Sequence, residues 1–310
     1  MSSSLLHQIF LASLAHAYVC TNFVAPITVN APSYTPSFKE FGTHYDAVQF
    51  LVGLTTRPTI GTLSPFSGSQ NLTVDFAIDS SFCTEDGKYN GNQDIQVLSH
   101  GLGFDKSYWD FGERDSEYNY VRAATNAGYA TMAWSRPGNG HSSSGNAYSV
   151  LQTEIQSAVL IELTKLLRSG RLHAGISKPT GRVLHVGHSF GSALSNILIA
   201  KNPELSDGVV LTGLSHNLTL GSQFPASTNF HFAKENQPER FGNLSTGILT
   251  WADELALQYN FFKYPYFDPE VLAYAETYKW PFGKHPRGLI VQWNKTNNIV
   301  VRLTSTFLST

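Results

Sequence analysis

The chain has 310 residues and a formal net charge of −2, from 21 Lys and Arg against 23 Asp and Glu. This near balance offers no basic face, so we expect neither nucleic acid nor an anionic membrane as a partner. Charged residues make up 14% and aromatic residues 13% of the chain. That composition excludes a disordered protein, and the length fits one large domain or a domain with a cap.

The first 17 residues resemble a secretory signal peptide. The short apolar stretch Leu5–Ala17 ends in Ala15-x-Ala17, the small-residue pattern that precedes a cleavage site. We therefore predict a secreted protein that is cleaved after Ala17. The stretch is too short to cross a bilayer as a helix, and no longer apolar run follows it, so we expect no integral membrane segment. No Lys or Arg precedes the stretch, which leaves a peripheral N-terminal helix as the alternative.

Two cysteines, Cys20 and Cys83, would survive this cleavage. In a secreted chain an even pair is a candidate disulfide, and two buried free thiols are the alternative. Asn-x-Ser/Thr sequons, which are compatible with a secretory route, are candidate glycosylation sites. They lie at Asn71, Asn217, Asn243 and Asn294.

Short strands are expected first, followed by alternating strands and helices. Val48–Leu54 and Leu72–Ile78 alternate in polarity between turn residues, which predicts antiparallel strands. Between residues 94 and 212 strands alternate with helices, which predicts βαβ units and a mostly parallel sheet flanked by helices. The strands are Asp94–Ser99, Tyr129–Trp134, Arg182–Val186 and Gly208–Thr212, and the helices are Tyr118–Asn126, Val150–Arg168 and Phe190–Asn202.

The segment Gly187-His188-Ser189-Phe190-Gly191 lies between a predicted strand and a predicted helix. In that context Gly-x-Ser-x-Gly is typical of a nucleophile elbow, a strained turn that projects the serine hydroxyl above the sheet. A side chain at either glycine would collide with the neighbouring strand or helix. The N–H groups at the start of the helix face any oxyanion that forms. We predict Ser189 as the nucleophile and the Phe190 N–H as an oxyanion donor.

A second glycine-rich segment, 100–104 (His-Gly-Leu-Gly-Phe), follows an apolar strand. Hydrolases with an elbow take their second oxyanion donor from such a loop, and we assign that role to the Leu102 N–H. A plain glycine turn is the alternative. This segment lacks the third glycine of a dinucleotide site, and His185-x-x-His188 lacks a third metal ligand, so we expect no cofactor and no metal.

Other polar residues near these motifs have simpler interpretations. Ser135–Ser142 follows a strand and is expected to form a turn at the edge of the site. Histidines interpreted as packed or surface residues are His141, His185, His188 and His216. After His216 the chain becomes dense in aromatic residues, and we interpret residues 216–285 as a largely helical cap over the catalytic face. The rings could equally be the core of a helical insertion, and the two interpretations overlap.

These motifs resemble the secreted α/β-hydrolase proteins of filamentous fungi, a lipase- and esterase-like branch (AB hydrolase-1) often linked to secondary-metabolite pathways. The resemblance covers roughly residues 20–280. The matching segments are Cys20–Pro26, His100–Asp110, His185–Ser192, Asp207–Gly213 and Phe267–Glu270. The resemblance implies an α/β-hydrolase fold, secretion, Ser189 as nucleophile, and Leu102 and Phe190 as oxyanion donors.

The chain departs from this family in two places. The family usually has Asp before the Arg of the turn after Trp134, whereas this chain has Ser135. The triad order of the fold is Ser, then Asp or Glu, then His. The acid is expected after the strand Gly288–Val291, but no Asp or Glu follows Glu276, and the nearest positional match is Asn297. The last histidine, His285, precedes that strand, so both the triad acid and the triad histidine are unassigned.

The sequence therefore predicts residues 1–17 as signal peptide, 18–215 as hydrolase core, 216–285 as cap, and 286–310 as a partial or divergent end of the core. The first functional hypothesis is an esterase- or lipase-like hydrolase, or an acyl-transferring enzyme, acting on an apolar small molecule. The second is a degenerate, noncatalytic member that acts as a binding or accessory protein, and a lyase or isomerase is a third. A base for Ser189, if present, could be His100, His141 or His188.

Overall fold

A computed structural model describes residues 18–36, 40–49, 66–112, 117–215, 224 and 227–283. Several sequence predictions lie outside these described residues. They are the signal peptide, the sequons at Asn217 and Asn294, His216, His285, Asn297, and the strand Gly288–Val291 with the predicted C-terminal end 286–310.

The main sheet has six described strands in the order β1-β2-β4-β3-β5-β6. Strands β4, β3, β5 and β6 pair in parallel, whereas β2 is antiparallel to both β1 and β4. The strands are β1 (Val19–Pro36), β2 (Phe66–Thr84), β3 (Ile95–Ser99), β4 (Ala130–Trp134), β5 (Val183–His188) and β6 (Gly208–Thr212). The α/β-hydrolase fold, with a mostly parallel sheet and an antiparallel N-terminal part, is confirmed.

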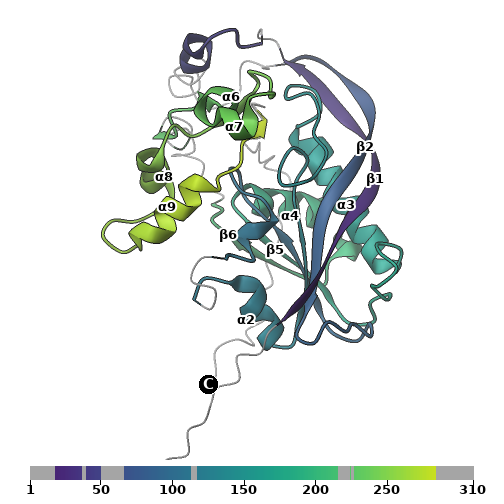
Figure 1. The fold of residues 1–310 in the computed structure, drawn as a ribbon. Helices are drawn as coiled ribbons and strands as arrows, with labels where there is room; N and C mark the ends of the chain where they lie inside the picture. The colour runs from purple at the N-terminus through teal and green to yellow at the C-terminus, as the bar shows by residue number, and fades with distance from the viewer. Residues whose placement is uncertain are drawn as a thin grey trace, which may run out of the picture.

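Helices cover both faces of this sheet (Figure 1). Successive residues of a strand point to opposite faces. Val97 of β3 packs in one core with α3 (Thr153–Arg168) and α4 (Phe190–Lys201), whereas Leu98 packs on the other face with Val121 of α2 (Tyr120–Asn126). The three predicted helices begin and end within three residues of the observed bounds. Strands β3 and β4 are buried along their whole length, whereas β6 is partly exposed.

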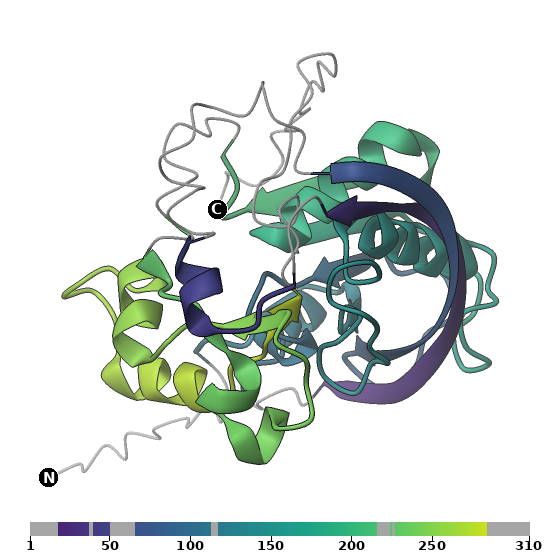
Figure 2. The same ribbon diagram turned by 90° about the horizontal axis from the view of Figure 1, so that it is seen from above.

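The N-terminal strands are longer than the sequence predicts. β1 and β2 pair along almost their whole length and curve together around one side of the molecule (Figure 2). Their inward residues, such as Ile27 and Val29, are buried and alternate with exposed ones. The predicted strand Val48–Leu54 is wrong at its start, because residues 44–49 are helical and residues 50–65 lie outside the described part. The Asp46 carboxylate accepts the backbone N–H groups of Gly42 and Thr43 at 2.9 and 2.7 Å, which favours a helical turn there.

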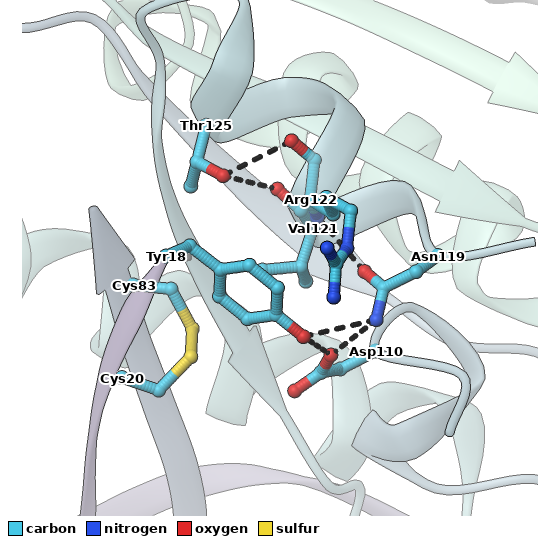
Figure 3. The surroundings of a disulfide bond; sticks show 8 residues. All are labelled: Tyr18, Cys20, Cys83, Asp110, Asn119, Val121, Arg122 and Thr125. Carbon is cyan, nitrogen blue, oxygen red and sulfur yellow. Dashed lines mark hydrogen bonds between the residues drawn. A yellow bond between two sulfur atoms is a disulfide. The ribbon is translucent and has the colours of Figure 1, made fainter. Parts of the chain in front are cut away.

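A disulfide joins Cys20 of β1 to Cys83 of β2, which face each other in the antiparallel register. Figure 3 shows Tyr18 beside this bond, with its ring near Val121 and its hydroxyl directed at Asp110. That hydroxyl donates to the Asp110 carboxylate and accepts from the Asn119 side chain at 2.9 Å. Burial, and then the Asp110 carboxylate, raise the pKa of Tyr18 to about 12. The start of β1 is therefore held both by the disulfide and by the hydrogen bonds of a half-buried phenol.

The cap lies across the molecule from β1 and β2 (Figures 1 and 2). It contains α6 (Ala233–Asn236), α7 (Pro238–Phe241), α8 (Glu254–Phe261) and α9 (Pro269–Thr277), and a three-stranded antiparallel sheet of β7 (His231–Phe232), β8 (Ile248–Thr250) and β9 (Phe282–Gly283). We call this unit, residues 231–283, the cap; it contains strands as well as helices. Its core includes Phe41 and Ala47, so a segment assigned to the hydrolase core packs with the cap.

Inside the cap, the fully buried Lys279 ammonium donates to the Glu276 carboxylate and to the Trp251 carbonyl oxygen, the latter at 3.0 Å. Burial lowers the pKa of Lys279 and raises that of Glu276. The pair fixes the end of α9 against β8, because a buried charge is tolerated only where its partners satisfy it.

One buried histidine links three elements of the main domain. His185 of β5 lies with Nε2 3.0 Å from Thr164 Oγ1 of α3 and Nδ1 2.9 Å from Ser206 Oγ. Burial, reinforced by the positive charge of Arg168, lowers the pKa of His185 to about 3. The ring is therefore neutral in the folded chain at neutral pH, as expected for a packed histidine.

We expect the Cys20→Ser, Cys83→Ser double variant to lose about 2–5 kcal/mol of unfolding free energy, because the bond restricts the unfolded chain across a separation of 63 residues. Urea denaturation with and without reductant measures this loss. Reduced wild type should match the double variant, and the double variant should not respond to reductant. A wild-type midpoint that is unaffected by full reduction would contradict the prediction.

We expect the unfolding free energy to fall as pH drops below about 6.5. His185 becomes protonated there in the unfolded chain, whereas in the folded chain it stays neutral until about pH 3. Each such group contributes a slope of up to about 1.4 kcal/mol per pH unit. Urea titrations between pH 7 and pH 4 should give a shallower slope for His185→Gln than for wild type. Equal slopes would show that His185 does not titrate differently in the two states.

Candidate active site

The turn at Ser189 joins β5 to α4 in a conformation that side chains rarely adopt. Ser189 has φ 51° and ψ −116°, and it is one of two described non-glycine residues with positive φ. Such a backbone costs about 1–3 kcal/mol and is kept where the surrounding structure enforces it. A Cβ atom at Gly191 would lie 2.0 Å from the Ser99 carbonyl oxygen, and one at Gly187 would lie 2.5 Å from the Ser192 backbone. Both glycines are therefore required for the close approach of α4 to the sheet.

The end of β6 holds the turn in place. The Ser189 N–H donates to the Thr212 carbonyl oxygen at 2.8 Å, and the Ser192 hydroxyl donates to the same oxygen at 2.8 Å. Ser189 immediately precedes Phe190, the first residue of α4, whose N–H is among those without a partner inside the helix. This arrangement leaves the Phe190 N–H available to an anion at the end of the sheet.

The loop after β3 lies directly against this turn. A Cβ atom at Gly101 would be 3.1 Å from the Ser189 Cβ, so the two predicted motifs are in contact. Leu102 and Phe190, the two predicted oxyanion residues, line one cavity. The rest of its wall is Arg136, Pro137, Gly138, Asn139, Leu151, Gln156, Ile248, Pro281, Phe282 and Gly283. The turn Ser135–Ser142 thus supplies part of the wall, at the edge where the sequence places it.

The Gly101–Leu102 peptide is fixed through its carbonyl group. The Gly101 oxygen accepts from His100 Nδ1 at 2.9 Å and from the Arg136 guanidinium at 3.0 Å. His100 Nε2 accepts the Arg136 backbone N–H at 3.0 Å, so both nitrogens of this fully buried ring are occupied. Burial, then the charge of Arg136, hold the pKa of His100 well below its usual range. His100 is thus a neutral structural residue and not the base for Ser189.

The carboxylate near this turn comes from another strand. Asp79 of β2 accepts from the Lys106 ammonium and, at 3.2 Å, from the Ser135 hydroxyl. The backbone N–H of His141 also donates to the Asp79 carboxylate, at 3.3 Å. Ser135 therefore stands where the resemblance expects Asp, and Asp79 supplies a carboxylate beside it.

The remaining histidines do not provide an obvious base. His188 stacks on Tyr108 with ring centroids 4.8 Å apart, and its Nδ1 lies 3.2 Å from the Thr212 hydroxyl. Burial lowers the pKa of His188, which favours the neutral ring. The His141 side chain is exposed. Across the described residues, no imidazole is hydrogen-bonded to the Ser189 hydroxyl.

The cap is anchored on the same loop. Gly103 has φ 76°, and a Cβ atom there would lie 1.7 Å from the Trp251 ring. The backbone N–H of Trp280 donates to the Gly103 carbonyl oxygen at 2.8 Å. The centroids of the Phe104 and Trp251 rings lie 5.7 Å apart. The aromatic residues of the cap therefore meet the main domain one residue beyond Leu102.

Sequence reasoning includes Arg136 only as part of the turn Ser135–Ser142 and Trp251 only as part of the aromatic segment 216–285, and it does not single out Asp79. The only sequence signal for Arg136 is its place in a Pro- and Gly-containing turn after an apolar strand. Within the described ranges, no group of three or more His, Cys, Asp or Glu residues could hold a metal ion. A search of the same residues finds no helix long and apolar enough to cross a bilayer.

Comparisons with solved structures show partial similarities. Among solved structures, the chain is similar to an epoxide hydrolase from Vigna radiata, with 18% identity over 44% of this chain and 34% of that chain and a TM-score of 0.32. It is also similar to Rv0554 from Mycobacterium tuberculosis, with 20% identity over 56% of this chain and 50% of that chain and a TM-score of 0.33. The chain thus spans about a third to a half of the length of these structures. No curated protein matches it.

A sequence model of the alpha/beta hydrolase family matches residues 96–303, which is more than half of the chain. The match includes the loop after β3, the turn at Ser189 and most of the cap. The chain belongs to the alpha/beta hydrolase family.

Proposed function

We propose that the chain is a serine hydrolase of the esterase or lipase type, or a related acyl-transferring enzyme, acting on an apolar small molecule. The observation that carries this proposal is the left-handed turn at Ser189, which lies against Gly101 and immediately before Phe190. Leu102 and Phe190 then line one cavity beside the hydroxyl-bearing turn. A nucleophile and two oxyanion donors at one edge of the sheet fit acyl transfer.

In the proposed reaction, Ser189 Oγ attacks the acyl carbonyl carbon and the carbonyl oxygen becomes an oxyanion. The N–H groups of Phe190 and Leu102 donate to that oxygen. The carbonyl re-forms as the C–O bond to the alcohol breaks, the alcohol leaves with the proton given up by the Ser189 hydroxyl, and the acyl group stays on Ser189 Oγ. Water releases it as an acid, or a second alcohol takes it in acyl transfer.

The wall of this small cavity is polar at Arg136, Asn139 and Gln156, and its apolar part supports an apolar substrate. Leu151, Ile248 and Phe282 line it together with Leu102 and Phe190. Two of these side chains, Ile248 and Phe282, belong to β8 and β9 of the cap. The resemblance to secreted fungal hydrolases supports a further proposal, that the substrate belongs to fungal secondary metabolism.

One observation favours the second hypothesis, a noncatalytic binding or accessory protein. In the part of the chain that the structure describes, no imidazole contacts the Ser189 hydroxyl and no residue is identified as a triad acid. A serine hydroxyl without an adjacent base is a poor nucleophile. Reactivity of Ser189 itself therefore separates the two hypotheses.

We expect a fluorophosphonate probe to label wild type and not Ser189→Ala, and wild type to hydrolyse short-chain nitrophenyl esters. The wild-type rate should exceed that of Ser189→Ala by at least about 10²-fold, because the variant has no hydroxyl to form the acyl-enzyme. Gel fluorescence measures labelling, and nitrophenolate absorbance measures hydrolysis.

The matched control is Ser195→Ala, which removes another buried hydroxyl of α4 that donates to Gly191 O at 3.0 Å. It should be labelled like wild type. Equal hydrolysis rates for wild type and Ser189→Ala, with no labelling of either protein, would contradict the proposed enzymatic function and support the noncatalytic one.

We also propose that the chain is secreted and begins at Tyr18 after cleavage. The disulfide supports this proposal, because disulfides persist in oxidising compartments. The hydrogen bond from the half-buried Tyr18 hydroxyl to Asp110 supports a chain that is ordered from residue 18. Asn71 and Asn243, two of the candidate glycosylation sites, are exposed.

Expression in a eukaryotic secretory host should therefore give protein in the medium whose N-terminal residue is Tyr18. Endoglycosidase treatment should lower its mass, and changing both Asn71 and Asn243 to Gln should reduce that shift. N-terminal sequencing and intact mass spectrometry measure both results. Ala17→Arg serves as the control, because cleavage requires a small residue there. Protein retained in the cell with its first residues intact would overturn the proposal.

A further inference from the structure

The Arg136 guanidinium is a buried charge without a carboxylate partner among the residues that the structure describes. Arg136 is 2% exposed, and its two hydrogen bonds go to neutral acceptors, Gln156 Oε1 at 2.7 Å and the Gly101 carbonyl oxygen at 3.0 Å. A guanidinium has five N–H donors, and its Nε has no partner in the described structure. Burial lowers the pKa of Arg136 to about 9, so the group is still protonated at neutral pH.

An uncompensated buried charge costs free energy, and it is retained where it has a use. Arg136 lines the same cavity as Leu102 and Phe190, and its guanidinium donates to the oxygen of Gly101, which lies against Ser189. The charge is therefore close to the place where an acyl-transfer reaction would develop a negative charge.

Arg136 touches both halves of the proposed oxyanion hole. Its guanidinium carbon lies 5.0 Å from the centroid of the Phe190 ring, within the range of a cation–π contact. Its hydrogen bond to the Gly101 oxygen acts on the peptide unit whose other end is the Leu102 N–H. In a trans peptide the C=O and N–H point in opposite directions, so holding the carbonyl fixes the direction of the N–H.

The same hydrogen bond also changes the strength of that donor. The Gly101 oxygen accepts from both Arg136 and His100, and hydrogen bonds in a chain polarise one another. Withdrawing electron density at the carbonyl makes the Leu102 N–H a better donor to an anion on the other side of the peptide.

We propose that Arg136 is a positioning residue of the oxyanion hole, which aims the Leu102 N–H through the Gly101 carbonyl and adds a buried positive charge that stabilises the oxyanion. This inference rests on the proposed acyl-transfer function. Arg136 does not bond to the reacting atoms; it acts through the Gly101–Leu102 peptide, the Phe190 side chain and the field across the cavity.

The test compares Arg136→Met, which removes the charge and both hydrogen bonds, with Arg136→Lys, which keeps the charge. Arg122→Met is the matched control, because the Arg122 guanidinium lies over the Tyr18 ring at 5.5 Å, near the disulfide and away from the cavity (Figure 3). For each protein we would measure the rate of fluorophosphonate labelling, kcat and KM for a nitrophenyl ester, the Kd of an alkyl boronic acid, and Tm. The boronic acid forms a tetrahedral anion on the serine, and the ester is neutral in its ground state.

Arg136→Met should lower the labelling rate and kcat by roughly 10²-fold, the scale seen when one oxyanion donor is lost. Its KM should stay within about threefold of wild type, because the ground-state ester has no oxyanion to lose contact with. Boronic acid affinity should fall in step with kcat across both variants, with Arg136→Lys in between. Arg122→Met should match wild type. A merely structural role would shift Tm and KM without this parallel.

Wild-type labelling rates in a folded Arg136→Met protein would overturn this inference alone. If Arg136→Met does not fold, Arg136→Lys is used for the test instead. A lower Tm of Arg136→Lys with wild-type kcat and boronic acid affinity would then overturn the inference. Wild-type protein that is not labelled at all overturns the proposed function, and this inference with it.

Discussion

The close approach of α4 to the end of β3 is the constraint on which the site depends. A Cβ atom at Gly191 would lie only 2.0 Å from the Ser99 carbonyl oxygen, so the helix can begin there only because residue 191 has no side chain. The chain must then turn from β5 into α4 within one residue, and Ser189 takes up the left-handed conformation that this requires. The same approach brings the loop after β3 against the turn, with Gly101 beside Ser189. The positions of the proposed nucleophile and oxyanion donors thus follow from one packing contact.

A second close approach connects this loop to the cap. Trp251 occupies the space where a side chain at Gly103 would be, and Trp280 donates its N–H to the Gly103 oxygen. Both contacts involve Gly103, the residue that follows Leu102. Because β8 and β9 belong to the same three-stranded sheet, Ile248 and Phe282 of the cavity wall are fixed relative to that anchor. The structure therefore fixes the position of these two apolar side chains relative to the Gly101–Leu102 peptide, which we propose binds the oxyanion.

Much of this architecture follows from the sequence, and the parts that do not have physical reasons. The turn at Ser189 and the parallel strands can be predicted because the elbow and the strand–helix alternation are local patterns. β1 could not, because Pro26 and Pro32 interrupt its pattern; both face outward on a strand with β2 as its one described neighbour in the sheet, where proline is tolerated. The helix at residues 44–49 forms where Phe41 and Ala47 pack into the cap, a contact more than a hundred residues away in the chain. The partners of Arg136 come from two further segments, so no local pattern predicts them.

The distribution of charge around the turn after β4 explains why Arg136 keeps its positive charge uncompensated. Asp79 of β2 already supplies a carboxylate there, and it is engaged by Lys106 and the Ser135 hydroxyl. An aspartate at position 135 would place a second carboxylate against the first, and like charges at such distances disfavour ionisation of both. A serine avoids that conflict and leaves no acid beside Arg136 in sequence. Under the proposed acyl-transfer function, the negative charge that complements the guanidinium is the oxyanion that would form beside Ser189, and a charge held there favours that state over the neutral substrate.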